Sequence, residues 1–188
     1  MMVIEKQEAD YRRQGGEVQL LPLHTKWGLF PITVLIFSLT FILSSMIPIE
    51  KSLAEEIMVS LKEQFLNSNL IVVFLNNLLL SLVMMIPVFG FVFSIFSSSL
   101  NGTAISAISI VTGSPPLHIA IKLLSNPGVI LEILAFGLAS AQSLAGFFAI
   151  VEKRFRRELK EYLTTIVVVI GLLLISALLE MFFQTISS

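Results

Sequence analysis

The chain has 188 residues, of which 55% are hydrophobic and only 13% are charged. A soluble domain of this size carries about 25% charged residues, so this composition argues against a soluble globular protein. The formal net charge is −1 and there is no cysteine, which excludes a strongly basic nucleic-acid surface, disulfide bonds and cysteine-based chemistry.

Three long stretches without a charged residue, 27–49, 64–121 and 164–179, predict membrane spans. We expect an all-α fold: an integral membrane helical bundle of about five transmembrane helices plus an amphipathic interfacial helix. Residues 1–26 are expected to form a cytoplasmic N-terminal segment, and residues 27–188 a single transmembrane helical domain. The acidic residues of the first segment do not fit a secretory signal, so the first span is expected to be retained.

The first span is predicted at residues 27–47, between an interfacial tryptophan and a helix-ending proline. Residues 51–66 repeat an apolar residue every fourth position among acidic ones, which predicts an amphipathic helix. Attachment to the membrane surface and packing on the bundle as a linker helix are equally favoured for it. A second span is predicted at about 69–96, followed by a turn at 97–102, because serine clusters and Asn-Gly favour turns.

A third span is predicted at 103–122, kinked or broken near 113–116 by Gly-Ser-Pro-Pro, with its last part either continuous or a separate short helix. The fourth span is predicted at 129–150 and the fifth at 162–183. The connection between them, 152–161, holds five Lys/Arg, and the N-terminal segment holds four. The positive-inside rule therefore predicts a multi-pass protein of the cell membrane with a cytoplasmic N-terminus and an external C-terminus.

Small residues predict how the fourth span packs. Gly137, Ala141 and Ala145 repeat at a spacing of four, and Gly146 falls on nearly the opposite side. Small residues allow close helix packing in membranes, so we expect this helix to lie between two neighbours. One such stripe could serve a homodimer, although packing within the chain is the favoured interpretation.

Two glutamates lie inside predicted spans, where an acidic group costs on the order of 3 kcal/mol by insertion scales. The predicted topology gathers them with other polar groups on the outer side. The expected polar cluster consists of Glu132, Glu180, Asn76, Asn77, His118 and Lys122. Three interpretations stay open: a structural hydrogen-bond cluster with the lysine as counter-ion, a cation or proton site, and a binding site for a partner protein or lipid headgroup.

The sequence has no phosphate-binding loop, no His-Glu-x-x-His helix and no Gly-x-Ser-x-Gly elbow. We therefore expect no enzymatic activity, no catalytic residues and no cofactor, and metal binding is left undecided. The expected partners are the lipid bilayer, other membrane proteins and a second copy of the chain, but not nucleic acid.

An ordered set of residues resembles the stage II sporulation protein M family of bacterial and archaeal multi-span membrane proteins. The set runs from Asn76-Asn77 through Asn101-Gly102 and Gly128 to Glu132 and Leu178-Leu179-Glu180, within residues 66–183. Family members typically show His-Gly-x-x-Glu before the fourth helix. Here Pro127 replaces the histidine, and the glutamate comes one residue later.

The resemblance implies a non-enzymatic membrane scaffold or assembly factor. In spore-forming bacteria the family takes part in engulfment, where it helps to localise a complex with peptidoglycan-degrading partners. The alternative from the residues themselves is a small transporter, permease or ion-binding membrane component that uses Glu132 and Glu180 near the outer leaflet.

Overall fold

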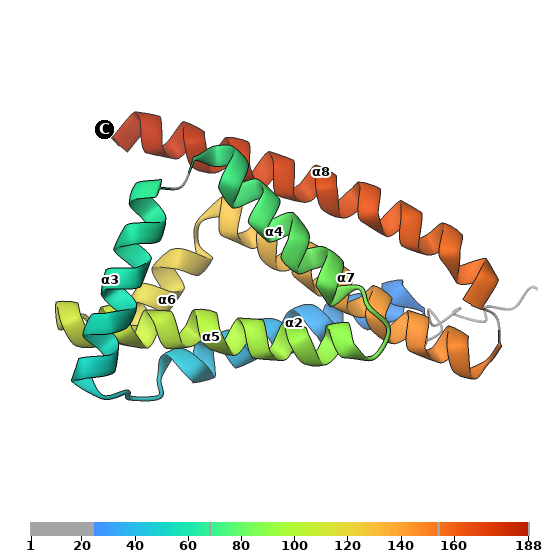
Figure 1. Ribbon diagram of the computed structural model, residues 1–188, viewed down its shortest axis with the longest axis horizontal. Coiled ribbons are helices and arrows are strands. Elements are labelled where there is room, and N and C mark those ends of the chain that lie inside the picture. The colour runs from blue at the N-terminus through green and yellow to red at the C-terminus, as the bar shows by residue number, and fades with distance from the viewer. Residues whose placement is uncertain (1–24, 68, 154, 188) are drawn as a thin grey trace, which may run out of the picture.

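The computed structural model describes residues 25–67, 69–153 and 155–187, and its regular elements there are helices (Figure 1). In chain order they are α2 (Lys26–Ser45), α3 (Lys51–Asn67), α4 (Leu70–Met84), α5 (Phe89–Thr112), α6 (Pro116–Leu124), α7 (Pro127–Val151) and α8 (Phe155–Ser187). The predicted all-α class is confirmed. The N-terminal segment predicted at 1–26 lies, except for its last two residues, outside the described part.

Four of these helices, α2, α5, α7 and most of α8, are long and apolar enough to cross a membrane. The apolar helix α4 has only 15 residues, which is about 22 Å at 1.5 Å per residue and shorter than the roughly 30 Å hydrocarbon layer. The prediction of about five spans is therefore confirmed in part: four full-length helices and one shorter one. The exposed apolar side chains along these helices suit contact with lipid.

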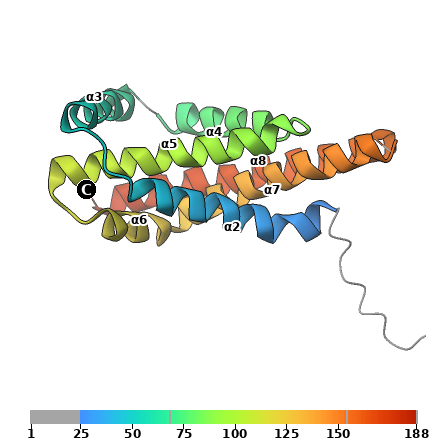
Figure 2. The ribbon, with the colours of Figure 1, turned by 90° about the horizontal axis from the view of Figure 1, so that it is seen from below.

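The helices run between two ends of an elongated bundle (Figures 1 and 2). The start of α2, the α4–α5 turn and the α7–α8 connection lie at one end, which we call the basic end. Helices α3 and α6 and the end of α8 lie toward the other, which we call the α3–α6 end. Helices α2, α5 and α8 therefore run away from the basic end, and α4 and α7 return to it.

The second span predicted at 69–96 and the turn predicted at 97–102 are wrong, because α4 ends at Met84 and α5 runs without interruption from Phe89 to Thr112. The turn lies earlier, after Met84, where Pro87 cannot continue a helix and Val88 adopts a positive φ of 67°. The turn requires glycine at position 90, because a Cβ there would collide with the backbone carbonyl of Met84. Ser143 of α7 holds the turn: its hydroxyl donates to Ile86 O at 2.6 Å and accepts from Phe91 N at 3.2 Å.

Two further helix boundaries can be compared with the prediction: the break in the third span and the start of the last helix. The third span is broken: α5 ends at Thr112, Gly113 adopts a left-handed φ of 72°, and α6 starts at Pro116 as a separate short helix. Most of the connection predicted at 152–161 is helical, because α8 begins at Phe155 rather than near residue 162. The basic residues there belong largely to the first turns of α8.

Helix α3 lies across the long axis of the bundle and packs on α5 (Figure 1). Ala54 on its inner face is fully buried, while Leu53 and Val59 remain exposed. Its contact with α5 supports the packed linker-helix interpretation of this amphipathic segment.

The core lies where α7 meets α2, α4 and α8. Phe37, Met84, Phe136, Val169 and Leu173 form its main apolar cluster. Helices α2 and α5 approach each other closely at Gly102, where a Cβ would collide with the backbone carbonyl of Phe41. Close backbone approach of this kind is how helices associate in lipid, where apolar surface gives little driving force.

Candidate functional site

Two glutamates predicted to share one depth do come together. Glu132 of α7 and Glu180 of α8 lie within electrostatic range of each other. The side-chain amide of Asn77 on α4 donates a hydrogen bond to Glu132 Oε1. Both carboxyl groups are half-buried. We call Asn77, Glu132 and Glu180 the carboxylate cluster; it joins three helices near the start of α7.

The local fold at the start of α7 brings this cluster together. Asn126 caps the helix, with its Oδ1 accepting from Gly128 N at 2.9 Å. Ser176 of α8 donates to Gly128 O at 2.9 Å, and the side chain of Glu180 packs against the glycine, leaving little space for a Cβ. The helix cap and the glycine therefore seat α8 directly against the first turn of α7.

The structure does not bring the other predicted polar residues to the cluster. Asn76 is exposed on α4, whereas the adjacent Asn77 is hydrogen-bonded to Glu132. His118 and Lys122 are exposed on α6, which packs on α2, α5 and α7 but not on α4 or α8. Among the described residues, no hydrogen bond or ion pair joins either side chain to Glu132 or Glu180. The lysine is therefore not placed as their counter-ion.

The small residues of α7 lie at two helix contacts. A Cβ on Gly137 would collide with Val34 of α2, and Ala141 and Ala145 pack with Leu29 of the same helix. Gly146 faces α8, where a Cβ would collide with the Tyr162 hydroxyl. Helix α7 thus lies between α2 and α8, with small residues toward both.

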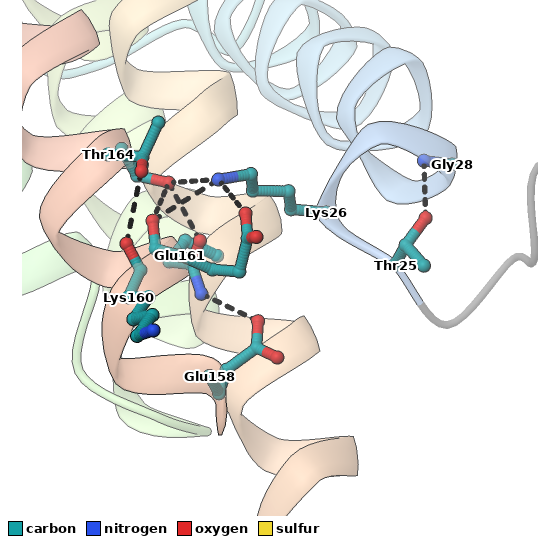
Figure 3. A network of polar contacts seen from close by, with 9 residues as sticks. Thr25, Lys26, Gly28, Glu158, Lys160, Glu161 and Thr164 are labelled. Carbon is teal, nitrogen blue, oxygen red and sulfur yellow. Dashed lines mark hydrogen bonds and ion pairs between the residues drawn. The ribbon is translucent and has the colours of Figure 1, made fainter. Parts of the chain in front are cut away.

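A second polar cluster, which the sequence patterns did not predict, lies at the basic end (Figure 3). Lys26 at the start of α2 is only 3% exposed, and its Nζ lies 2.7 Å from Glu161 Oε2 of α8. The same Nζ donates to Thr165 Oγ1 at 3.0 Å, and that hydroxyl donates to Gln142 Oε1 of α7 at 2.7 Å. Gln142 Nε2 then donates to Glu158 Oε1 at 3.0 Å. We call these five residues the Lys26 network; it ties α2, α7 and α8 together.

Part of this network was visible in the sequence. Glu158, Glu161 and Thr165 are spaced three and four residues apart, so they share one face if the segment is helical. The prediction placed the first two in a loop and therefore did not apply helical spacing to them. Their partners, Lys26 and Gln142, come from distant parts of the chain, and no local pattern pairs them.

No family model, curated protein or solved structure matches this chain. The carboxylate cluster has the oxygens to bind a proton or a small cation and also the amide donor to hold helices together. Within the described ranges, no group of three or more His, Asp or Glu side chains is arranged to hold a metal ion.

Proposed function

We propose that this protein is a non-enzymatic membrane scaffold or assembly factor. The observation that carries the proposal is that polar side chains inside the bundle join one helix to another. The Lys26 network links α2, α7 and α8, Thr33 donates to Gly137 O at 2.7 Å, and Ser98 donates to Phe37 O at 2.6 Å. Interhelical hydrogen bonds and small-residue contacts fix helices relative to one another in lipid. The bundle is thus suited to present a fixed apolar outer surface to other membrane proteins.

The resemblance to the stage II sporulation protein M family favours the same role. Four residues that carry it lie where α4, α7 and α8 meet: Asn77 is hydrogen-bonded to Glu132, and Glu180 packs against Gly128. In this proposal they stabilise the meeting point of three helices. We further propose that the basic end is cytoplasmic and the C-terminus external, because the Lys/Arg excess lies at the basic end.

Photo-crosslinking in native membranes tests the scaffold proposal. A photoreactive residue replaces Val167 of α8, which is 69% exposed, or Val169 of the same helix, which is fully buried. Leu35 of α2, 58% exposed, provides a second outward position. A scaffold gives adducts of discrete protein mass from at least one exposed position and only intramolecular links from Val169. Adducts with lipid alone at both exposed positions would contradict the proposal.

The carboxylate cluster favours a second candidate, a small transporter or ion-binding membrane component. Two carboxyl groups on neighbouring helices inside the spans supply the acidic oxygens that a proton or cation path uses. Asn77 supplies a neutral partner at the same point. Intramembrane glutamates that mark ion paths are arranged in this way.

Flux through proteoliposomes separates the two candidates. The full chain is reconstituted, and proton or monovalent-cation uptake is followed with an internal dye. The transporter candidate requires flux that Glu132→Gln or Glu180→Gln abolishes while Glu63→Gln, on the exposed face of α3, leaves it intact. Absence of flux, or flux that all three variants preserve, contradicts the transporter and leaves the scaffold as the proposed function.

A further inference from the structure

The basic end carries more exposed cations than exposed carboxylates among its described residues. Lys26 and the segment 152–161 together hold six Lys/Arg and three Glu. Lys153, Arg156 and Lys160 are exposed. Glu158 is 9% exposed and accepts from Gln142. Glu161 is 52% exposed, but its carboxylate is ion-paired with Lys26, and Glu152 is exposed. Because Lys26 neutralises Glu161 and Glu158 is buried, the three exposed cations of this segment outnumber its remaining exposed carboxylate, Glu152, among the described residues.

The depth of these cations follows from the Lys26 network. The ion pair places the start of α2 level with Glu161. Trp27, 48% exposed, lies beside Lys26, whose Nζ is 5.3 Å from the centre of the indole ring. Exposed tryptophan at the start of a span marks the membrane–water interface. The interface is therefore expected near the level of Glu161.

The exposed cations lie just beyond that level. Lys160 is one residue and Arg156 five residues toward the N-terminus of α8, which corresponds to about 2 and 8 Å along the helix axis. Lys153 lies in the connection beyond the start of α8, after α7 ends at Val151. Each headgroup layer of a bilayer is roughly 5–8 Å thick. Lys160 and Arg156 thus fall at phosphate depth, with Lys153 at its outer edge.

We propose that the basic end is a binding surface for anionic phospholipid headgroups, formed by Lys153, Arg156 and Lys160. Juxtamembrane cations attract anionic lipid with about a fivefold gain in affinity for each charge near the surface. This proposal is argued from the exposure, charge and membrane depth of the three side chains, so it does not depend on the proposed scaffold function. It also does not depend on which side of the membrane the basic end faces.

Native mass spectrometry tests the lipid surface. The full-length protein is released from bilayers of equimolar phosphatidylcholine and phosphatidylglycerol, and the ratio of anionic to zwitterionic lipid retained is measured. The triple variant Lys153→Gln, Arg156→Gln, Lys160→Gln is expected to lower this ratio at least fivefold. Raising the salt concentration to about 0.5 M is expected to lower the wild-type ratio too, because it screens exposed charges.

The opposite end of the bundle provides a matched control. Lys51, Lys62 and Lys122 are three exposed cations toward the α3–α6 end, and their replacement by Gln removes the same charge. This control is expected to retain the wild-type ratio, as is the charge-preserving variant Lys153→Arg, Arg156→Lys, Lys160→Arg, which also reports on folding. An unchanged ratio in the first triple variant, an equal loss in the α3–α6 control, or a loss in the charge-preserving variant would overturn the proposal.

Discussion

Gly102 is the point where the close contact between α2 and α5 can be tested. A Cβ at this position would overlap the carbonyl oxygen of Phe41 and crowd the backbone nitrogen of Ser45. Both are backbone atoms, so no side-chain rotation relieves the overlap. Gly102→Ala is expected to push the two helices apart by about 1 Å, to reach ordinary van der Waals separation.

The energetic cost of this shift follows from the contacts that flank Gly102. Overpacking costs about 1–3 kcal/mol. Three side-chain hydrogen bonds of 2.6–2.9 Å cross the same contact. Ser98 donates to Phe37 O, Ser106 donates to Ile47 O, and the hydroxyls of Ser44 and Ser99 bond to each other. Their weakening adds about 2 kcal/mol at roughly 0.6 kcal/mol each. The higher helix propensity of alanine relative to glycine offsets about 1 kcal/mol of this loss. The expected loss in the free energy of unfolding is about 2–4 kcal/mol.

The assay is reversible unfolding of the full chain in mixed micelles by added SDS, followed by circular dichroism. Gly171→Ala is the matched control, because Gly171 lies within α8 and a Cβ there meets nothing within 4 Å. The control is expected to be neutral or stabilised by up to about 1 kcal/mol. If Gly102→Ala unfolds at the same SDS fraction as Gly171→Ala, the close α2–α5 contact inferred here is wrong.

The remaining predictions use the same chain in simpler tests. Lys26→Met is expected to lower the unfolding free energy by about 2 kcal/mol, because it leaves the Lys26 network without its cation. The control Lys51→Met removes the lysine of an exposed ion pair and should change the unfolding free energy by less than about 0.5 kcal/mol. Comparable losses in the two variants in SDS unfolding would contradict the role of the network. Ser143→Ala is expected to cost about 1–2 kcal/mol, since the α4–α5 turn loses a donor and an acceptor; wild-type stability would show that the turn holds without it. Arg156→Cys in this cysteine-free chain should resist a membrane-impermeant thiol reagent in intact cells, and rapid labelling would refute the proposed orientation.

The contrast between two turns shows where local patterns were insufficient. Residues 97–102 have the Ser, Asn and Gly composition of a turn, yet they lie inside α5. In a membrane bundle these small polar residues allow close approach, and their hydroxyls donate to carbonyls of the neighbouring helix, as Ser98 does to Phe37 O. The observed turn needs Pro87, the glycine at position 90 and Ser143, and the last of these is contributed by a distant helix.

The sequence by itself determined that this chain forms apolar helices separated by polar connections. Long stretches without charge leave no other way to satisfy the backbone in lipid, and Glu132 and Glu180 stood out because charge is costly there. Only the tertiary structure decided which polar groups meet. Glu132 accepts from Asn77 and lies near Glu180, while His118 and Lys122 lie on a helix that does not pack on α4 or α8. Lys26, unremarkable at the edge of a span, is buried against Glu161. These pairings join residues up to 139 positions apart, and they depend on how whole helices pack rather than on any local spacing.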